Sequence, residues 1–258
     1  MPKEKTSKEY DKEYHLKAFK TMGLEEVEFI TTGIADFDAL TQIPRGRVTQ
    51  IQGQYGVGKT TLCLNMLKGL RDKKVLYIDS EASLNPQLLV DLELNSDNFQ
   101  LYNESAFIED IYDVILKAVE KPQYDLIILD SLASTTFRTE AANEAADANI
   151  GQKAKIVNKL MRIVPSELRK TNTALVIINQ EREIIGGYVP MKYTPGGMGV
   201  PYAASLMISL KTIKSWRFPK TGPPFKGHEI EAQIIKSKVN DPWRTAKFKL
   251  YYKAEDMK

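Results

Sequence analysis

Residues Gly53 to Thr61 read GQYGVGKTT, with the spacing G-x-x-x-x-G-K-T from Gly53 to Thr60. In this pattern glycines let backbone N–H groups approach phosphates, the lysine reaches the β- and γ-phosphates, and the threonine hydroxyl faces Mg²⁺. A phosphate loop also requires a strand before it and a helix after it, and apolar runs lie on both sides. We therefore predict a nucleotide-binding loop made of Gly53, Gln54, Tyr55, Gly56, Val57, Gly58, Lys59, Thr60 and Thr61.

Three further polar residues stand at or just beyond the ends of apolar runs. Asp130 follows Leu126–Leu129 and could share the magnesium ion with Thr60, unless it only caps a turn. Glu81 could orient the water that attacks the γ-phosphate, or be an exposed loop glutamate. Gln180 could hydrogen-bond the γ-phosphate and couple it to the order of the next loop, or simply end a strand.

These residues need elements that bring them together. Apolar runs predict strands at 48–52, 75–78, 126–129 and 175–178, and helices are expected at 60–70, 105–119 and 151–170, with Ser105 as an N-cap. Strands that alternate with helices indicate an α/β fold with a mostly parallel sheet, whose carboxyl ends share one ligand-binding edge. Late strands near 204–213, 229–239 and 243–252 have no helix between them, so we expect an antiparallel extension.

The strand near 229–239 carries two lysines at its end. Ile230, Ala232, Ile234, Lys236 and Lys238 share one parity, which places them on one face of an ideal strand. Burying two unpaired lysine charges would cost free energy, so we expect the pair to contact an anion or water. The alternative is that the end of the strand is simply exposed to solvent.

Residues 181–199 form a long segment with five glycines, two prolines and two tyrosines. Single-strand binders combine cations with flat or apolar side chains, a description that fits Arg182, Ile185, Tyr188, Lys192 and Tyr193. The alternative is a flap over the nucleotide. An earlier segment, residues 138–150, is acidic and alanine-rich and has Arg138 as its cation.

Composition limits the class of protein. The chain has 258 residues and a net charge of +3, so any nucleic-acid surface must be local. There is one cysteine, Cys63, and the two histidines lie far apart, which argues against disulfides and zinc. No signal peptide or membrane span is evident, so we expect a cytoplasmic protein with an N-terminal polar arm at 1–29 and a core at 30–258.

Six segments occur in the order found in the core of the RecA recombinase family, and over roughly residues 30–252 the chain resembles that family. The segments are GQYGVGKTT, YIDSEASLNP, LIILDSLAS, VIINQ, TPGGMGVPYAAS and IIKSKVNDPWRTAKFKLYY. The resemblance implies a RecA-like P-loop ATPase core that uses ATP and Mg²⁺ and forms helical filaments on single-stranded DNA. It further implies pairing with homologous double-stranded DNA.

The resemblance also suggests roles for individual residues. Glu81 matches the glutamate that activates water, and Asn85 and Pro86 fall in the segment that touches adenine. Gln180 matches the γ-phosphate sensor that opens the second DNA-binding loop. The remaining matches are Arg138–Ile150 for the first DNA loop, Gly196 and Gly197 for the end of the second loop, and Lys236 and Lys238 for a lysine pair that reaches the neighbouring subunit's nucleotide.

Bacterial members carry a further C-terminal domain without a counterpart after Phe248–Tyr252, so we interpret the chain as a minimal core, of the kind expected from a phage or mobile element. Two other functions remain open at this point. The chain could be an accessory DNA-dependent ATPase without strand exchange, or a ring-forming helicase motor. The Gly-Gly pair and the Lys-x-Lys pair favour the recombinase.

Overall fold

The computed structural model describes residues 26–84, 86–91, 94, 97–138, 151–183, 192–215 and 227–251. Its helices are α2 (Ala35–Leu40), α3 (Lys59–Gly69), α4 (Pro86–Asp91), α5 (Ile108–Val119), α7 (Gln152–Thr171) and α8 (Gly199–Ala203). Its strands are β1 (Phe29–Ile30), β2 (Ile43–Pro44), β3 (Val48–Gly53), β4 (Val75–Asp79), β5 (Phe99–Tyr102), β6 (Leu126–Asp130), β7 (Ala174–Gln180), β8 (Arg182–Glu183), β9 (Lys192–Tyr193), β10 (Leu206–Ser215), β11 (Gly227–Ser237) and β12 (Thr245–Tyr251).

Within these residues the central sheet has eight strands in the order β12-β11-β10-β3-β7-β6-β4-β5. The strands from β10 to β5 are parallel to one another, and β11 and β12 continue the sheet in antiparallel fashion. This confirms the predicted mostly parallel α/β fold and its antiparallel extension. The extension is shorter than expected, because β10 itself runs parallel to β3 after a crossover through α8.

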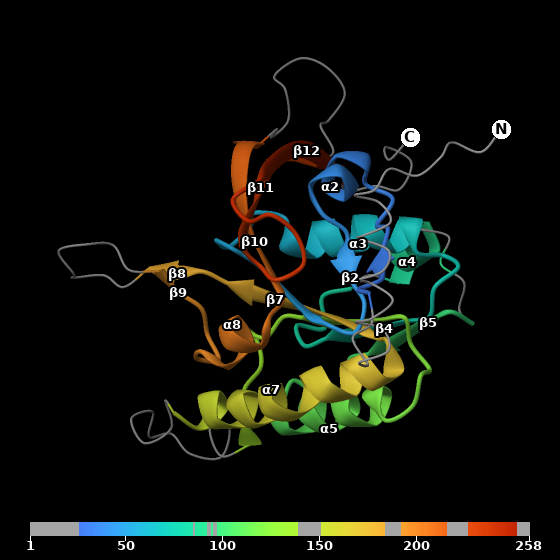
Figure 1. The fold of residues 1–258 in the computed structure, drawn as a ribbon, viewed down its shortest axis with the longest axis vertical. Helices are drawn as coiled ribbons and strands as arrows, with labels where there is room; N and C mark the ends of the chain where they lie inside the picture. The colour runs from blue at the N-terminus through green and yellow to red at the C-terminus, as the bar shows by residue number, and fades with distance from the viewer. Residues whose placement is uncertain are drawn as a thin grey trace, which may run out of the picture.

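Helices cover both faces of the sheet (Figure 1). One hydrophobic cluster lies between the sheet and α2 and α3, and a second lies between the sheet and α5, α7 and α8. Successive strand residues alternate between the two clusters, as Tyr77 in the first and Ile78 in the second do on β4. Because both faces are buried, the parallel strands read as continuous apolar runs instead of alternating ones.

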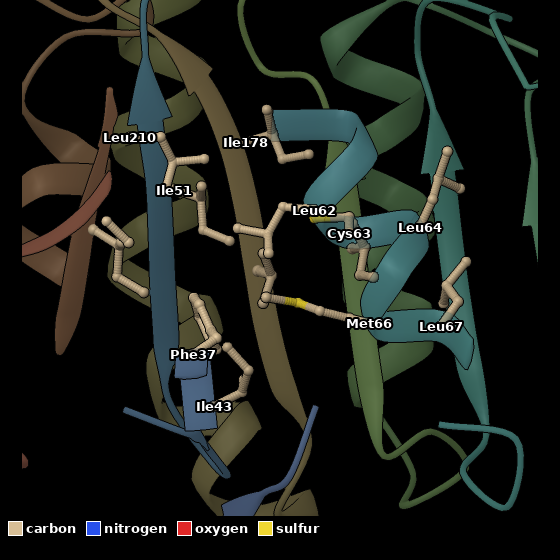
Figure 2. Close-up of a cluster of buried hydrophobic side chains, with 14 of the residues drawn as sticks. Phe37, Ile43, Ile51, Leu62, Cys63, Leu64, Met66, Leu67, Ile178 and Leu210 are labelled. Atoms are coloured by element: carbon tan, nitrogen blue, oxygen red, sulfur yellow. The ribbon is translucent and has the colours of Figure 1, made fainter. Parts of the chain in front are cut away.

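The helix that follows the phosphate loop is anchored in the first cluster (Figure 2). Leu62, Cys63 and Met66 of α3 are fully buried and face strand residues such as Ile51 and Ile178. The predicted core position of Cys63 is thereby confirmed. This packing fixes the first turn of α3, and with it Lys59 and Thr60, relative to the edge of the sheet.

The strand register brings the predicted polar ends together. Gly53 lies beside Gln180, and Asp79 lies beside Asp130. All four positions are at the carboxyl edge of the parallel strands, as the sequence predicted.

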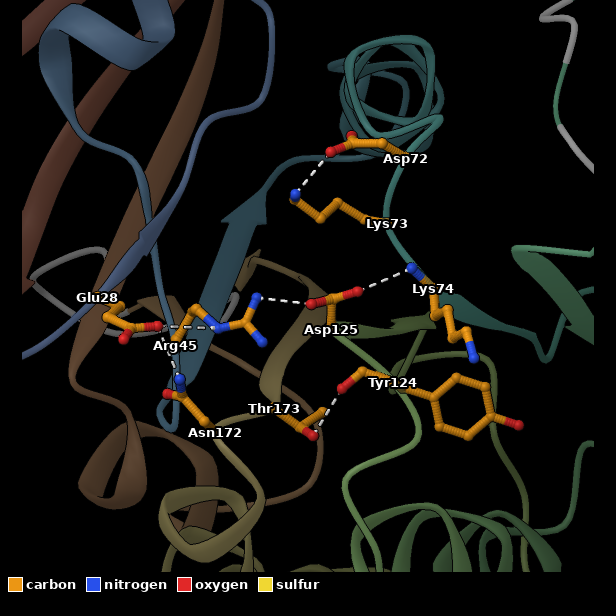
Figure 3. A network of polar contacts seen from close by, with 9 residues as sticks. All are labelled: Glu28, Arg45, Asp72, Lys73, Lys74, Tyr124, Asp125, Asn172 and Thr173. Atoms are coloured by element: carbon orange, nitrogen blue, oxygen red, sulfur yellow. Dashed lines mark hydrogen bonds and ion pairs between the residues drawn. The ribbon is translucent and has the colours of Figure 1, made fainter.

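At the opposite, amino edge a polar network joins three segments (Figure 3). The Arg45 guanidinium donates to Asp125 Oδ1 at 2.8 Å and lies 3.6 Å from the Glu28 carboxylate. The second Asp125 oxygen accepts the backbone N–H of Lys74 at 2.9 Å. The network ties the start of β4 and β6 to the chain that leads into β3.

Two helix details differ from expectation or extend it. Helix α5 begins at Ile108 with Phe107 at the N-cap, so the prediction that Ser105 is the N-cap is wrong. Ser105 instead accepts the N–H of Phe107 at 3.0 Å and donates to Asp110 at 2.6 Å. Helix α7 contains Pro165 in its interior.

Among the described residues, no helix has the length and apolar character needed to cross a bilayer.

Candidate active site

The phosphate loop joins β3 to α3. Gly58 occupies the N-cap of α3 at φ +95°, a left-handed conformation that favours glycine. The Lys59 ammonium lies beneath the loop and donates to the carbonyl oxygens of Gly53 at 3.0 Å and Gln54 at 2.8 Å. Burial lowers the pKa of Lys59, and the nearby carboxylates of Asp130, Glu181 and Glu81 oppose this effect. The loop therefore holds a buried cation at the N-terminus of a helix, which is a ready anion-binding arrangement.

Asp130 lies at the tip of β6 and is 3% exposed. It accepts a hydrogen bond from the Tyr77 hydroxyl at 2.6 Å, and it lines the same cavity as Thr60. Burial raises the pKa of Asp130 to about 6, although the side chains of Tyr77 and Thr60 favour the charged form. The sequence predicted Asp130 and Thr60, but Tyr77 was missed because its contact depends on strand pairing.

The Thr60 and Asp130 pair fits a magnesium ion. Mg²⁺ prefers oxygen donors and is commonly held by one or two protein ligands together with substrate phosphates. Among the described residues, no cluster of three or more histidine, cysteine or acidic side chains could hold a metal without such help. The donor set therefore suits a cation that arrives with a nucleotide.

Glu81 lies in the turn after β4, and its side chain is exposed. The Asp79 carboxylate accepts the Glu81 N–H at 3.2 Å and the Leu84 N–H at 2.8 Å, which holds the turn. Ser131 Oγ donates to Glu81 Oε1 at 3.1 Å. One glutamate oxygen is thus fixed by the residue that follows β6, a contact that the sequence did not predict.

Gln180 ends β7, and its neighbour Asn179 tethers the loop that follows. Asn179 is fully buried, and its Nδ2 donates to the Pro195 carbonyl oxygen at 2.9 Å. Its Oδ1 accepts the N–H of Gln180 at 3.0 Å. A second anchor holds Glu181, whose carboxylate accepts hydrogen bonds from Gln52 at 2.8 Å and Ser209 at 3.0 Å. Hydrogen bonds therefore fix both the start of the segment, at Glu181, and its end, at Pro195.

These groups surround one cavity of about 280 Å³. Its lining consists of Tyr55, Gly56, Gly58, Lys59, Thr60, Thr61, Glu81, Asp130, Ser131, Ile178 and Gln180. Of the other predicted loop residues, Gly53 and Gln54 bind Lys59, and the side chain of Val57 is buried in the first cluster. Asn85 lies outside the described residues, and Pro86 opens α4.

Lys236 on β11 and Lys238 just after that strand lie elsewhere. Ser237 is paired with Leu206, the first residue of β10, so Lys236 and Lys238 are at the amino edge of the parallel strands. The site of the same chain is at the carboxyl edge. The two lysines therefore cannot line their own chain's cavity.

The prediction that Lys236 shares a face with Ile230, Ala232 and Ile234 is wrong. Met207 pairs with Lys236 whereas Ile208 pairs with Ile234, so a β-bulge at Ile235 breaks the alternation. Lys236 Nζ donates to the Pro201 carbonyl oxygen of α8 at 2.5 Å, on the face of the second cluster. Burial, and secondarily the charge of Lys238, lower the pKa of Lys236.

The candidate DNA segments are described in part. Arg138 forms an ion pair with Asp110 and stacks over Phe107, with its guanidinium carbon 4.9 Å from the ring centre. Arg182 is exposed on β8, which pairs with β9 and gives the segment from 181 to 199 a short two-stranded sheet. Only the backbone of Lys192 and Tyr193 is described, whereas Ile150, Ile185 and Tyr188 lie outside the described residues.

The glycine pair closes this segment against α7. Gly196 and Gly197 have φ values of +90° and +71°. A Cβ atom on Gly196 would lie 2.9 Å from Leu132 Cδ2, so a larger residue would clash as well as strain the backbone.

Comparisons with known proteins agree with this geometry. A family model described as the RecA N-terminal domain matches residues 3–256. Protein RecA of Sulfurimonas denitrificans is 31% identical over 255 residues, which span 95% of this chain and 73% of the relative. Protein RecA of Aquifex pyrophilus is 29% identical over 243 residues, which span 92% and 68%.

Among solved structures, the RadB recombinase has the same fold, with a TM-score of 0.61, 21% identity and coverage of 84% of this chain and 94% of that one. The family model covers nearly the whole chain, and the Sulfurimonas relative is aligned over most of both sequences. The chain therefore belongs to the RecA family of recombinases.

Proposed function

We propose that the chain is an ATP-dependent recombinase that assembles as a helical filament on single-stranded DNA and pairs it with a homologous duplex. The observation that carries the proposal is the shared cavity of Lys59, Thr60, Glu81, Asp130 and Gln180. These residues supply a phosphate-binding cation, magnesium ligands, a carboxylate for water and an amide for the γ-phosphate. Membership of the family supports the same reading.

In this proposal the residues divide the work of ATP hydrolysis. The loop N–H groups and Lys59 bind the phosphates, and Thr60 and Asp130 hold Mg²⁺, which offsets the negative charge of the phosphates when it is bound. Glu81, held by Ser131, orients or deprotonates the attacking water. Gln180 senses the γ-phosphate and transmits its presence to the anchored segment that begins at Glu181.

Lys236 and Lys238 belong to the site of the next subunit in this proposal. Their position at the opposite edge of the sheet supports a head-to-tail arrangement in which one subunit's amino edge meets its neighbour's cavity. The partial burial that lowers the pKa of Lys236 also favours an anionic partner for it. There the lysines would stabilise charge that develops during hydrolysis.

DNA contact is assigned to the segments around Arg138–Ile150 and Arg182–Gly197. Arg182 is exposed and available to a phosphate, and we extend the role to Ile185, Tyr188, Lys192 and Tyr193 on sequence grounds. Arg138 would have to exchange its ion pair with Asp110 for a DNA phosphate. We further assign a subunit contact to the arm at 1–29, with 30–258 as the ATPase core, in the cytoplasm.

Negative-stain microscopy with single-stranded DNA and a slowly hydrolysed ATP analogue tests the proposal directly. We expect continuous helical filaments that require the analogue and are absent with ADP. Closed rings would favour the helicase motor, and DNA-stimulated ATPase activity without assembly would favour the accessory ATPase. Either of these outcomes would overturn the proposed recombinase.

A further inference from the structure

The hydroxyl of Tyr77 reaches the carboxylate assigned to magnesium. Tyr77 lies on β4 and Asp130 ends the neighbouring strand β6, with Tyr77 paired to Ile128. Tyr77, Ile128 and the start of α3 all belong to the first-cluster face of the sheet. The Tyr77 side chain therefore extends from the level of Ile128 toward the carboxyl end of β6. Its hydroxyl donates to Asp130 Oδ2 at 2.6 Å.

The surroundings of the ring are apolar. Tyr77 is fully buried, its ring centre lies 6.3 Å from that of Phe99, and it belongs to the same cluster as Cys63 of α3. A phenylalanine would fill the same space without bringing a polar atom into the core. Burial of a hydroxyl is unfavourable unless it forms a hydrogen bond, so the contact with Asp130 is what makes tyrosine tolerable here.

The contact also restricts Asp130. One oxygen is held by Tyr77 from within the core, and Thr60, the other predicted magnesium ligand, lines the same cavity as the carboxylate. A carboxylate held on one oxygen cannot rotate freely about its Cβ–Cγ bond. Hydrogen bonds of this kind orient metal ligands, and their removal commonly weakens metal affinity.

We propose that Tyr77 is a positioning residue that orients the Asp130 carboxylate toward the magnesium ion held with Thr60. The inference rests on the proposed function, because it assumes that Mg²⁺ and ATP bind at this cavity. It goes beyond that function by assigning a role in metal affinity to a core residue that does not line the cavity.

The test compares Tyr77→Phe with the parent protein by Mg²⁺ titration of the binding of a fluorescent, non-hydrolysable ATP analogue. We expect the Mg²⁺ concentration at half-saturation to rise about 10-fold, within the range for outer-shell metal partners, while affinity for the analogue in EDTA is unchanged. Mn²⁺ binding followed by electron paramagnetic resonance should weaken in parallel. Tyr124→Phe is the matched control, because Tyr124 precedes β6, at the end remote from Asp130, and its hydroxyl bonds to Gln100 of β5. The Mg²⁺ midpoint of Tyr124→Phe should equal that of the parent.

A second pair of variants tests whether Tyr77 acts through Asp130. In an Asp130→Asn background, adding Tyr77→Phe should produce no further shift in the Mg²⁺ midpoint. If Tyr77→Phe fails to fold, 4-aminophenylalanine at position 77 keeps the ring with a weaker donor, and its midpoint should exceed that of the parent.

The outcomes are separable. An unchanged Mg²⁺ midpoint in a folded Tyr77 variant, even with a lower melting temperature, would overturn the positioning role and leave the proposed function intact. Failure of the parent protein to bind the analogue in a Mg²⁺-dependent way would overturn the proposed function and this inference together.

Discussion

Glu81 and Asp130 follow neighbouring strands, yet their environments differ and so do their expected roles. Glu81 is exposed and held by one serine hydroxyl, whereas Asp130 is buried and held by the hydroxyl of Tyr77. An accessible carboxylate suits proton transfer with water, and a buried one suits a fixed cation.

We expect Glu81→Gln to bind ATP as the parent does and to lose turnover by roughly 100-fold or more, since the amide keeps the shape of the side chain but is not a base. Single-turnover hydrolysis and analogue binding measure the two effects separately. Glu120→Gln, an exposed change at the end of α5, serves as the control. Equal turnover in Glu81→Gln and Glu120→Gln would remove Glu81 from the mechanism.

The raised pKa of Asp130 predicts a pH dependence of stability for the nucleotide-free protein. The folded-state pKa of about 6 exceeds the ordinary aspartate pKa of 3.8, so the stabilising contribution is present at low pH and is lost as pH rises from about 4 to about 6. Asp130→Asn lacks this titration. The melting temperature of Asp130→Asn relative to the parent should therefore increase between pH 4 and pH 7. A constant difference over that interval would contradict the assignment.

At the scale of the elements, the segment after β7 is anchored at both ends, through Glu181 and through Pro195. Gln180 lies between these anchors and the cavity. We expect Gln180→Ala to reduce the difference in DNA affinity between the ATP and ADP states, a coupling that is typically about 1–3 kcal/mol, with nucleotide affinity nearly unchanged. Fluorescence anisotropy with labelled single-stranded DNA measures it. A full ATP-to-ADP difference in the variant would place the sensor elsewhere.

The network at the amino edge should stabilise the sheet. Arg45→Met leaves Asp125 without its main cationic partner in a half-buried position, and we expect a loss of about 2 kcal/mol in the free energy of unfolding. The exposed Lys73–Asp72 pair nearby provides the control, since Lys73→Met should change stability by less than about 0.5 kcal/mol. Urea unfolding compares the two, and equal losses would show that burial at Arg45 does not matter.

The sequence predicted the elements with strong local signals. Strand ends next to Asp130 and Gln180 were predictable because apolar runs and parallel topology fix their edge. The direction of β10 was not, because a strand's partner depends on where the crossover through α8 returns.

Side-chain contacts between distant segments could not be predicted from the sequence either. The hydroxyl of Tyr77 on Asp130 and the amide of Asn179 on Pro195 each join residues whose proximity depends on the finished sheet. Lys236 was assigned to the wrong face because a single extra residue in β11 reverses the alternation, and no residue type marks that bulge.

At the scale of the whole molecule, the two edges of the sheet carry complementary parts of the proposed site. Lys59→Ala subunits and Lys236→Ala/Lys238→Ala subunits should each be inactive alone, because each lacks one half of every interface. When co-assembled, some interfaces join an intact loop to an intact lysine pair, and ATP hydrolysis should return. Mixed filaments without activity would show that the lysines do not act across the interface.

The opposite placement of cavity and lysines has a further consequence for an assembled filament. In the proposed helical filament the head-to-tail contact leaves both ends open, so the last subunit at one end would present a cavity without a neighbour's lysines. The first subunit at the other end would present lysines without a neighbouring cavity. A filament then contains one completed site fewer than its number of subunits. The proposal therefore predicts that the two ends differ chemically, with ATP at the uncovered cavity outlasting ATP in the interior. Short filaments would therefore hydrolyse less ATP per subunit than long ones. The rates at which subunits are added and lost would also differ between the two ends.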